Sequence, residues 1–182
     1  AYIFNTTTAE LIDTLDKEAE CVTDIAYSRD GNLVASANAN GSIAIWDTNS
    51  GSLLNTFQGH FEAVNSISWS PTGDQIASAS PEDGIIIWDI DTGERNKIVP
   101  FDATQICISW SPTNSLLAVA GVGQAVVIYD IEKGSFSSLG GGTFDIIRSA
   151  SWSPDGRRIA YCAYGRVSIS NLFPNDDLNY LR

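Results

Sequence analysis

The sequence contains no methionine, and His60 is the only histidine among its 182 residues. It has no apolar run near the roughly 20 residues that a membrane-spanning helix needs. The first residues, "AYIFNTTTAELIDTL", have neither a basic start nor a long apolar segment, so they do not predict a signal peptide. Because position 1 is not methionine, we expect the sequence to be an excerpt of a longer polypeptide. Because the sequence has no long apolar run, we expect no membrane insertion by these residues.

Basic residues are also scarce, with ten Lys and Arg against 22 Asp and Glu and a formal net charge of −12. Nucleic acids and anionic membrane surfaces attract clustered Lys and Arg. The ten basic residues are scattered along the chain and form no such cluster. The sequence therefore predicts no nucleic-acid partner.

The three cysteines, Cys21, Cys107 and Cys162, are odd in number and far apart, and they include no C-x-x-C pair. This pattern predicts neither a disulfide framework nor a zinc site, and it favours an intracellular compartment, cytoplasmic or nuclear. No G-x-S-x-G motif, calcium loop or phosphate-binding loop is present. We predict no catalytic residue, no metal and no cofactor, and hence a protein that is not an enzyme.

The sequence does contain a repeat. The segments "SIAIWD", "IIIWD" and "VVIYD" end at Asp47, Asp89 and Asp130, and related segments end at Asn5 and Asn171. The steps between these ends are 42, 42, 41 and 41 residues. A fixed period of this length indicates stacked structural units.

A second set of segments, which includes "ISWSPTGD" and "ASWSPDGR", keeps the same period. Each has an aromatic residue, then Ser, then a turn residue suited to positive φ. The aromatic residues are Tyr27, Trp69, Trp110 and Trp152, and the turn residues are Gly31, Gly73, Asn114 and Gly156. Because Asn tolerates the left-handed region better than other non-glycine residues, we expect Asn114 to adopt it too.

Each unit reads as four short strands joined by tight turns, without helical periodicity. Such units bury their faces only by stacking on their neighbours. A radial propeller and a linear β-solenoid are both built in this way. Hairpin turns within a unit require antiparallel pairing, which favours the propeller.

These motifs resemble those of the WD40-repeat β-propellers: "IWD" at 45–47 and 87–89, "WSP" at 69–71, 110–112 and 152–154, and "GH" at 59–60. The resemblance implies an all-β propeller segment of about four and a half blades. Residues 1–15 would supply the last two strands of an incomplete blade, and 16–57, 58–100, 101–139 and 140–182 would form successive blades. We expect a larger ring, of seven blades as is commonest in the family, whose remainder comes from missing sequence or another chain. A self-closed ring of four blades is the alternative, in which "AYIFN" would be redundant.

The family also implies a buried hydrogen-bonded network, which only one unit nearly matches, through His60, Ser78 and Trp88. At the acid position of this network the sequence has Glu82, with Asp83 beside it. At the His position the other units have Glu18, Phe101 and Thr143. We therefore expect these units to lack the network and to depend on apolar stacking.

By resemblance, the function expected is that of a non-catalytic scaffold or adaptor that binds a partner protein or peptide on one loop face. The contact positions that the family implies there are Thr23, Phe61, Asn65, Ile106, Arg148 and Tyr164. Two alternatives remain: a ligand-sensing or small-molecule-binding module, with an enzymatic role the least favoured, and a purely architectural module that makes contacts through its rim.

Overall fold

The computed structural model describes residues 2–4, 7–14, 21–99, 106–121, 126–139, 147–163 and 166–172. All regular secondary structure in these ranges is β-strand. Over the same ranges no helix is long and apolar enough to cross a membrane.

The strands form five sheets in which every pairing is antiparallel and follows chain order. The first sheet, which we call the half-blade, has two strands: β1 (Tyr2–Phe4) and β2 (Leu11–Thr14). Blade 1 contains β3 (Val22–Tyr27), β4 (Leu33–Asn38), β5 (Ser42–Asp47) and β6 (Leu53–Gln58). Blade 2 contains β7 (Ser66–Trp69), β8 (Gln75–Ser80), β9 (Gly84–Asp89) and β10 (Arg95–Val99).

Blade 3 contains β11 (Ile106–Trp110), β12 (Leu116–Gly121), β13 (Val127–Asp130) and β14 (Ser135–Ser138). Blade 4 has three described strands, β15 (Ile147–Trp152), β16 (Arg158–Ala163) and β17 (Arg166–Asn171). From the sequence, "LNYLR" at residues 178–182 is the candidate for the fourth strand of this blade; the segment lies outside the described residues.

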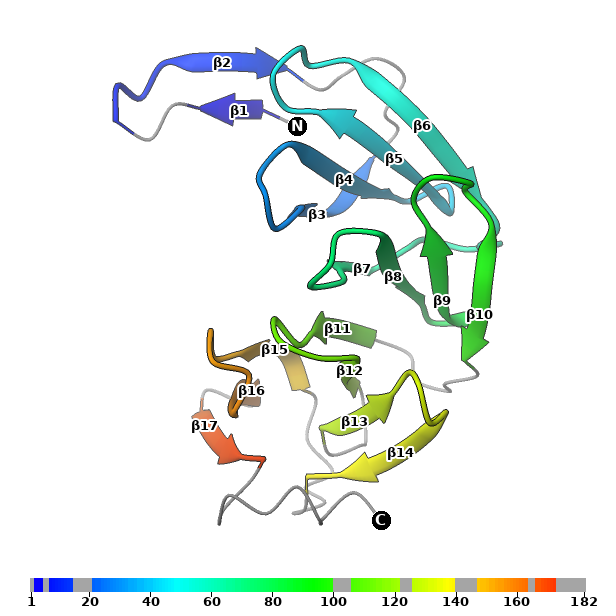
Figure 1. The fold of residues 1–182 in the computed structure, drawn as a ribbon, viewed down its shortest axis with the longest axis vertical. Coiled ribbons are helices and arrows are strands. Elements are labelled where there is room, and N and C mark those ends of the chain that lie inside the picture. Colours follow the sequence, from blue (N-terminus) through cyan, green and yellow to red (C-terminus); the bar gives the residue numbers. More distant parts are fainter. Residues whose placement is uncertain are drawn as a thin grey trace.

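The blades stand side by side along an open arc (Figure 1), with β3, β7 and β11 on its concave side and β6, β10 and β14 on its outer side. The half-blade lies at one end of the arc and blade 4 at the other. The predicted all-β propeller segment is therefore confirmed, and the solenoid is excluded because all pairings are antiparallel.

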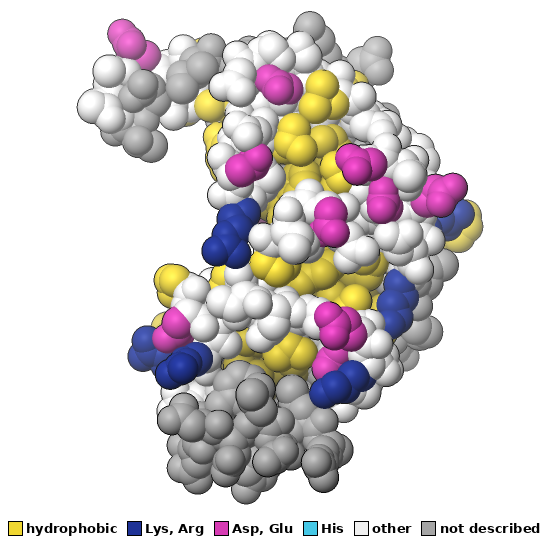
Figure 2. All heavy atoms as spheres, in the orientation of Figure 1, with side chains coloured by type: hydrophobic (Ala, Val, Ile, Leu, Met, Phe, Trp, Pro, Cys, Tyr) yellow, Lys and Arg dark blue, Asp and Glu magenta, His cyan; other side chains and the backbone are white. Residues whose placement is uncertain are grey.

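The core consists of apolar layers between successive blades. Strand β9 contributes to two of them, since Ile85 and Ile87 face blade 3 whereas Ile86 and Trp88 face blade 1. This explains why the strand is a continuous apolar run instead of an alternating one. Burial of each such side chain stabilises the fold by about 1.5–3 kcal/mol. Figure 2 shows hydrophobic side chains within the body of the arc, with acidic side chains among them and along the margins.

The turns between the first two strands of each blade follow the sequence prediction at three of the four positions. Gly31, Gly73 and Gly156 have positive φ, of 75°, 81° and 68°. Asn114 does not, so the prediction for this residue is wrong. Its side-chain Oδ1 instead accepts a hydrogen bond from the Leu116 amide, at 3.1 Å. This local bond stabilises the turn without a left-handed residue.

The free edges of two inner strands, β7 and β11, are bonded by side chains of the blade before them. The Ile67 amide donates to Asp24 Oδ2 at 2.9 Å, and the Ile108 amide, 41 residues further on, donates to Ser66 Oγ at 3.2 Å. The indole Nε1 of Trp69 likewise donates to the Ala26 carbonyl, at 3.0 Å. The hydrogen bonds between blades thus recur with the period of the sequence repeat.

One contact skips a blade. Arg29 follows β3, and its guanidinium donates to the carbonyl oxygen of Pro112, in the turn between β11 and β12, at 2.7 Å. It therefore connects blades 1 and 3 past blade 2.

Candidate functional site

The loop face lies at the end of the blades where each inner strand begins. Its described part consists of residues 59–65 between β6 and β7, the turn at 39–41 in blade 1, and the turn at 81–83 in blade 2. These three segments belong to neighbouring blades, so they can form one surface.

A buried network holds the 59–65 loop against blade 2. Trp88 Nε1 donates to Ser78 Oγ at 2.7 Å, and His60 Nε2 lies 2.7 Å from the same oxygen. His60 Nδ1 faces Asp83 Oδ2 at 3.4 Å. Three of the four predicted members, His60, Ser78 and Trp88, are thus brought together.

The fourth predicted member is wrong, because Glu82 is exposed and Asp83 takes the acid position. In the 81–83 turn, adjacent side chains point to different sides of the backbone. Only the side chain of residue 83 faces His60, and spacing alone could not distinguish the two acids.

Burial controls the protonation of His60. The removal of the imidazole from water lowers its pKa below the ordinary value, and this effect outweighs the nearby carboxylate of Asp83, which raises it. In a neutral ring with its proton on Nδ1, Nε2 accepts from the Ser78 hydroxyl, whereas Nδ1 lies 3.4 Å from Asp83 Oδ2 without a well-formed hydrogen bond. Both of these neighbours belong to blade 2, so the ring holds the loop against that blade.

Gly59 allows the loop to approach Trp88. A Cβ atom at this position would lie 2.7 Å from the indole Cη2 atom and 3.2 Å from Cδ of Arg95. The indole of Trp88 also stacks on Phe57, with ring centroids 5.7 Å apart and planes 16° apart. The "GH" pair therefore places a backbone segment directly on the Trp88 ring.

Phe61 is presented by this same framework. Its amide donates to Asp83 Oδ2 at 2.7 Å, so the carboxylate that faces His60 also fixes the Phe61 backbone. The Phe61 side chain is 90% exposed. A rigid main chain thus holds an aromatic ring in solvent.

Two other predicted contact residues lie close to this loop. The hydroxyl of Thr23, in β3 of blade 1, donates to the carbonyl oxygen of Val64. The amide of Asn65 donates to the carbonyl of Ala79 at 2.8 Å, and its side chain is exposed. The structure therefore places Thr23, Phe61 and Asn65 on adjoining parts of one face.

The remaining predicted contact residues are not part of this group. Arg148 is exposed near the start of β15, two blades away from the 59–65 loop. Ile106 begins β11. Tyr164 lies outside the described residues.

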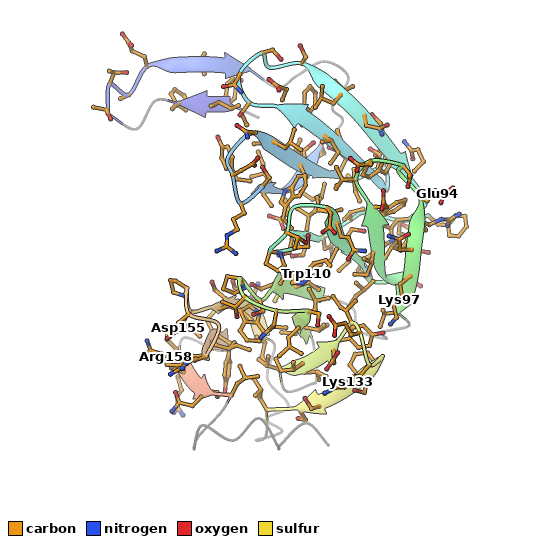
Figure 3. All side chains as sticks on the ribbon, viewed as in Figure 1. Glu94, Lys97, Trp110, Lys133, Asp155 and Arg158 are labelled. Atoms are coloured by element: carbon orange, nitrogen blue, oxygen red, sulfur yellow. The ribbon has the colours of Figure 1, made fainter. Side chains whose placement is uncertain are left out.

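The other blades replace the network in different ways. In blade 1, Trp46 Nε1 donates to Ser36 Oγ at 3.0 Å. The Trp–Ser bond of the network is therefore present in blade 1, although the sequence predicted that this blade lacks the network. In blade 3, Tyr129 packs on Phe136 with ring centroids 4.6 Å apart. Lys97, which extends from β10 towards blade 3 (Figure 3), lies 5.2 Å from the Tyr129 ring centroid and donates to the Ile131 carbonyl at 2.8 Å.

Sequence reasoning missed the polar residues that link the blades, Asp24, Ser66 and Cys107. They occupy one position of the repeat, and all three carry a hydrogen-bond acceptor. Because the three residue types differ, the repeat pattern alone did not reveal them. Burial raises the pKa of Cys107 to about 11, so its thiol remains protonated and unreactive at neutral pH.

Within the described ranges, no group of three or more His, Cys, Asp or Glu side chains could hold a metal ion. The described loop face exposes one aromatic ring, that of Phe61, with hydrogen-bonding groups around it. Such a surface suits recognition of another molecule.

The fold and the repeated turns define a β-propeller segment built from four-stranded antiparallel units. Residues 9–47 and 51–89 match the family model of the WD domain, G-beta repeat. These two stretches match WD40 repeats, and the chain as a whole has the fold of a β-propeller segment. Propellers of this family are generally non-catalytic and serve as scaffolds for protein interactions.

Among solved structures, the chain is similar to the Cps50 (Swd1) β-propeller domain of Myceliophteria thermophila, with a TM-score of 0.76 and 22% sequence identity. The match covers 85% of this chain and 52% of that one, so the chain spans about half the length of that domain. At this identity the likeness concerns the fold alone. No curated protein matches the sequence.

Proposed function

We propose that this chain is a non-catalytic interaction scaffold or adaptor that binds a partner protein or peptide on its loop face. Phe61 is the anchor of the proposed contact, and Thr23 and Asn65 adjoin it. Arg148, Ile106 and Tyr164 would extend the contact over blades 3 and 4. The presence of three free cysteines supports an intracellular site for this interaction, in the cytoplasm or the nucleus.

The observation that carries the proposal is the exposure of Phe61 on a fixed backbone. An aromatic ring left in water forgoes about 1.5–3 kcal/mol of burial free energy. Asp83 already holds the Phe61 amide, so a partner that covers the ring has to order little of the loop. Low ordering cost and an exposed aromatic ring are the properties of an interface hot spot.

Photo-crosslinking at position 61 in cells tests the proposal. A benzophenone amino acid replaces Phe61 in one variant and Leu54 in a matched control. Leu54 is exposed on β6, at the rim of blade 1, away from the loop face. We expect a discrete crosslinked protein from position 61 and none from position 54.

The captured protein is then purified, and its Kd is measured for the wild-type chain and the variants Phe61→Ala and Leu54→Ala. We expect Phe61→Ala to weaken binding at least about tenfold, the effect of losing about 1.4 kcal/mol, and Leu54→Ala to leave it unchanged. Equal binding by wild type and Phe61→Ala would contradict the loop-face assignment.

The architectural alternative has one observation in its favour. Leu53 and Leu54, on the outermost strand of blade 1, are exposed apolar side chains on the rim. If position 54 crosslinks and position 61 does not, the rim is the working surface and the architectural function replaces the scaffold.

We further propose that the arc is part of a larger ring, with seven blades, whose remainder comes from further sequence or from another chain. The side chains of Val167 and Ile169 in blade 4 are 76% and 67% exposed, whereas their equivalents in blade 3, Val126 and Ile128, are 2% and 1% exposed. In blade 3 these positions are covered by the next blade. The same apolar face of blade 4 is thus suited to another blade.

A further inference from the structure

The loop around Phe61 is acidic. The described segments of the loop face, residues 39–41, 59–65 and 81–83, contain the carboxylates of Glu62, Glu82 and Asp83 and neither Lys nor Arg. Asp83 belongs to the framework, since its Oδ2 accepts from the Phe61 amide and faces His60. Glu62 and Glu82 are exposed, and neither forms an ion pair with another described residue. Two unpaired carboxylates therefore lie on the two segments that Asp83 joins.

A basic residue approaches this loop from the outermost strand of blade 2. The side chain of Arg95, in β10, lies beside Gly59, where its Cδ would be 3.2 Å from an added Cβ atom. Burial is the largest cause of the lowered pKa of His60, and among the charges around that ring Asp83 acts more strongly than Arg95. The carboxylates therefore dominate the charge at the loop, even on the side of Arg95.

The negative charge of the chain is concentrated in the blades that carry this loop. Residues 1–100, which include blades 1 and 2, hold 15 of the 22 acidic residues but only four of the ten basic ones. The remaining residues hold seven acidic and six basic ones, so they are close to neutral. A charge distribution of this kind attracts cationic partners and speeds their association.

The exposed ring and the two carboxylates favour the same kind of side chain in a partner. The face of an aromatic ring is negative and attracts a cation placed over it. An apolar side chain would cover Phe61 as well, but it would leave Glu62 and Glu82 without a partner at the edge of the contact. The stem of a Lys or Arg side chain packs on apolar surface while its charged end reaches carboxylates.

We propose that the partner segment that covers Phe61 is basic. One Arg or Lys side chain lies over the Phe61 ring, and a second basic residue lies close to it, so that Glu62 and Glu82 are both paired. Arg suits the position better than Lys, because its planar guanidinium stacks on an aromatic ring and binds a carboxylate through two N–H groups. This inference rests on the proposed scaffold function and adds the chemistry of the partner.

Synthetic peptides of simple composition serve as the probe. Peptides of alternating Gly and Arg, Gly and Lys, and Gly and Glu are titrated into the ¹⁵N-labelled 182-residue chain, and amide shifts are recorded at low and high salt. We expect the Gly-Arg peptide to bind saturably, with its largest shifts in residues 59–65 and 81–83. The Gly-Lys peptide should bind more weakly and the Gly-Glu peptide not at all. The Kd of the Gly-Arg peptide should rise with salt, because exposed ion pairs are screened.

Two double variants with the same net charge separate the loop from the overall charge. Glu62→Gln/Glu82→Gln removes the loop carboxylates, and we expect it to weaken Gly-Arg binding at least about fivefold, as for the loss of two exposed ion pairs. The control, Asp91→Asn/Glu132→Gln, removes exposed acids from the turns between β9 and β10 and between β13 and β14. It should change the Kd less than about twofold. Phe61→Leu keeps an apolar side chain without an aromatic face, and should weaken binding about threefold.

Equal weakening by the two double variants would mean that the peptide responds to net charge alone, and would overturn the proposal. Unchanged binding by Phe61→Leu would overturn the cation over the ring. The protein captured by crosslinking at position 61 separates this inference from the scaffold function. If Phe61→Ala weakens its binding and Glu62→Gln/Glu82→Gln does not, the scaffold stands and the basic partner is wrong. If position 61 captures no protein but the Gly-Arg peptide binds as expected, the loop selects cations and the scaffold function is wrong.

Discussion

At the scale of single residues, His60 has a structural role, because it connects the 59–65 loop to blade 2. Its ring is buried, both nitrogens face groups of blade 2, and its pKa is lowered because burial disfavours the charged form. The unfolded chain therefore takes up a proton at a higher pH than the folded chain does. Stability contributed by neutral His60 is fully present above the unfolded pKa of about 6.5 and is lost as the pH falls below it.

Because His60 is the only histidine, its imidazole gives a single signal in a ¹H NMR titration. We expect this signal to titrate below pH 6.5 in the folded chain. The free energy of unfolding, from urea denaturation, should fall between pH 7 and pH 5, and this part of the pH dependence should be missing in His60→Gln. A titration midpoint above 6.5 would show that Asp83 outweighs burial.

Gly59 is a residue at which only glycine fits, because the backbone passes close to the Trp88 ring. Gly59→Ala places a methyl group against the Trp88 ring, and we expect a loss of about 1–3 kcal/mol, as is usual for an overpacked core. Urea denaturation measures it, with Gln58→Ala, at the exposed neighbouring position, as the control. A stability equal to that of the wild type would mean that the loop moves away from Trp88 at little cost.

The sequence predicted most of the residue-scale features near His60 but not all of them. His60, Ser78 and Trp88 could be predicted because their spacing matches a family pattern. Asp83 could not be separated from Glu82, because one residue decides which side of a turn a carboxylate faces. Asn114 was predicted wrongly because an Asn side chain can stabilise a turn by its own hydrogen bond as well as by a left-handed backbone.

At the scale of elements, the inner strands depend on their neighbours for hydrogen bonds as well as for packing. The edge of β11 has no further strand beside it in its own sheet, yet the Ile108 amide bonds to Ser66 and the Trp110 amide bonds to Ser68 Oγ at 2.9 Å. An exposed strand edge can pair with a strand of another chain. At the edge of β11, the Ser66 and Ser68 side chains bond the backbone amides instead. The blades are therefore joined by polar bonds on the inside of the arc.

Ser66→Ala should remove one of these bonds and leave the buried Ile108 amide without its partner. We expect a loss of about 1–3 kcal/mol, the cost of an unsatisfied buried donor. Urea denaturation gives the stability, and hydrogen exchange at the Ile108 amide reports the local effect. Ser52→Ala, at an exposed position, is the control. Unchanged exchange at Ile108 would show that water replaces the hydroxyl.

The strands themselves could be predicted from the sequence because apolar runs and turn residues recur at a fixed period. The polar links between blades could not, because Asp24, Ser66 and Cys107 share no residue type. Their role is visible only when the sheets are stacked and each side chain meets an amide of the next blade. Blade 3 lacks the hydrogen-bonded network of blade 2, and in its place the Lys97 ammonium lies over the Tyr129 ring. The repeat pattern does not predict this contact, because the other units lack this pair of residues.

At the scale of the whole molecule, the arc ends in two different surfaces. At one end, Ile25 and Tyr27 of β3 are exposed, whereas at the other end Val167 and Ile169 of blade 4 are exposed at positions that are covered in blade 3. Charge also differs along the arc. Residues 140–182 contain five of the ten basic residues but only four of the 22 acidic ones. The two ends therefore differ in shape and in charge, which favours different neighbours at each.

The apolar face of blade 4 should make the isolated chain associate with itself or bind hydrophobic dyes. We expect the double variant Val167→Thr/Ile169→Thr to lower dye fluorescence and concentration-dependent association in sedimentation. Its melting temperature should stay close to that of the wild type, since both side chains are exposed. Ile85→Thr, at a fully buried position, is the contrasting control and should unfold the chain readily. Unchanged dye binding in the double variant would mean that this face is already covered.

The contact between Arg29 and Pro112 has a mechanical consequence. Neighbouring blades are joined by apolar layers and by hydrogen bonds, and the Arg29–Pro112 bond adds a direct link from the first blade to the third. Any widening of the curve at blade 2 would stretch it. Separation of blades 1 and 3 would have to break this bond, so a partner that contacts both blades would meet a surface that resists widening.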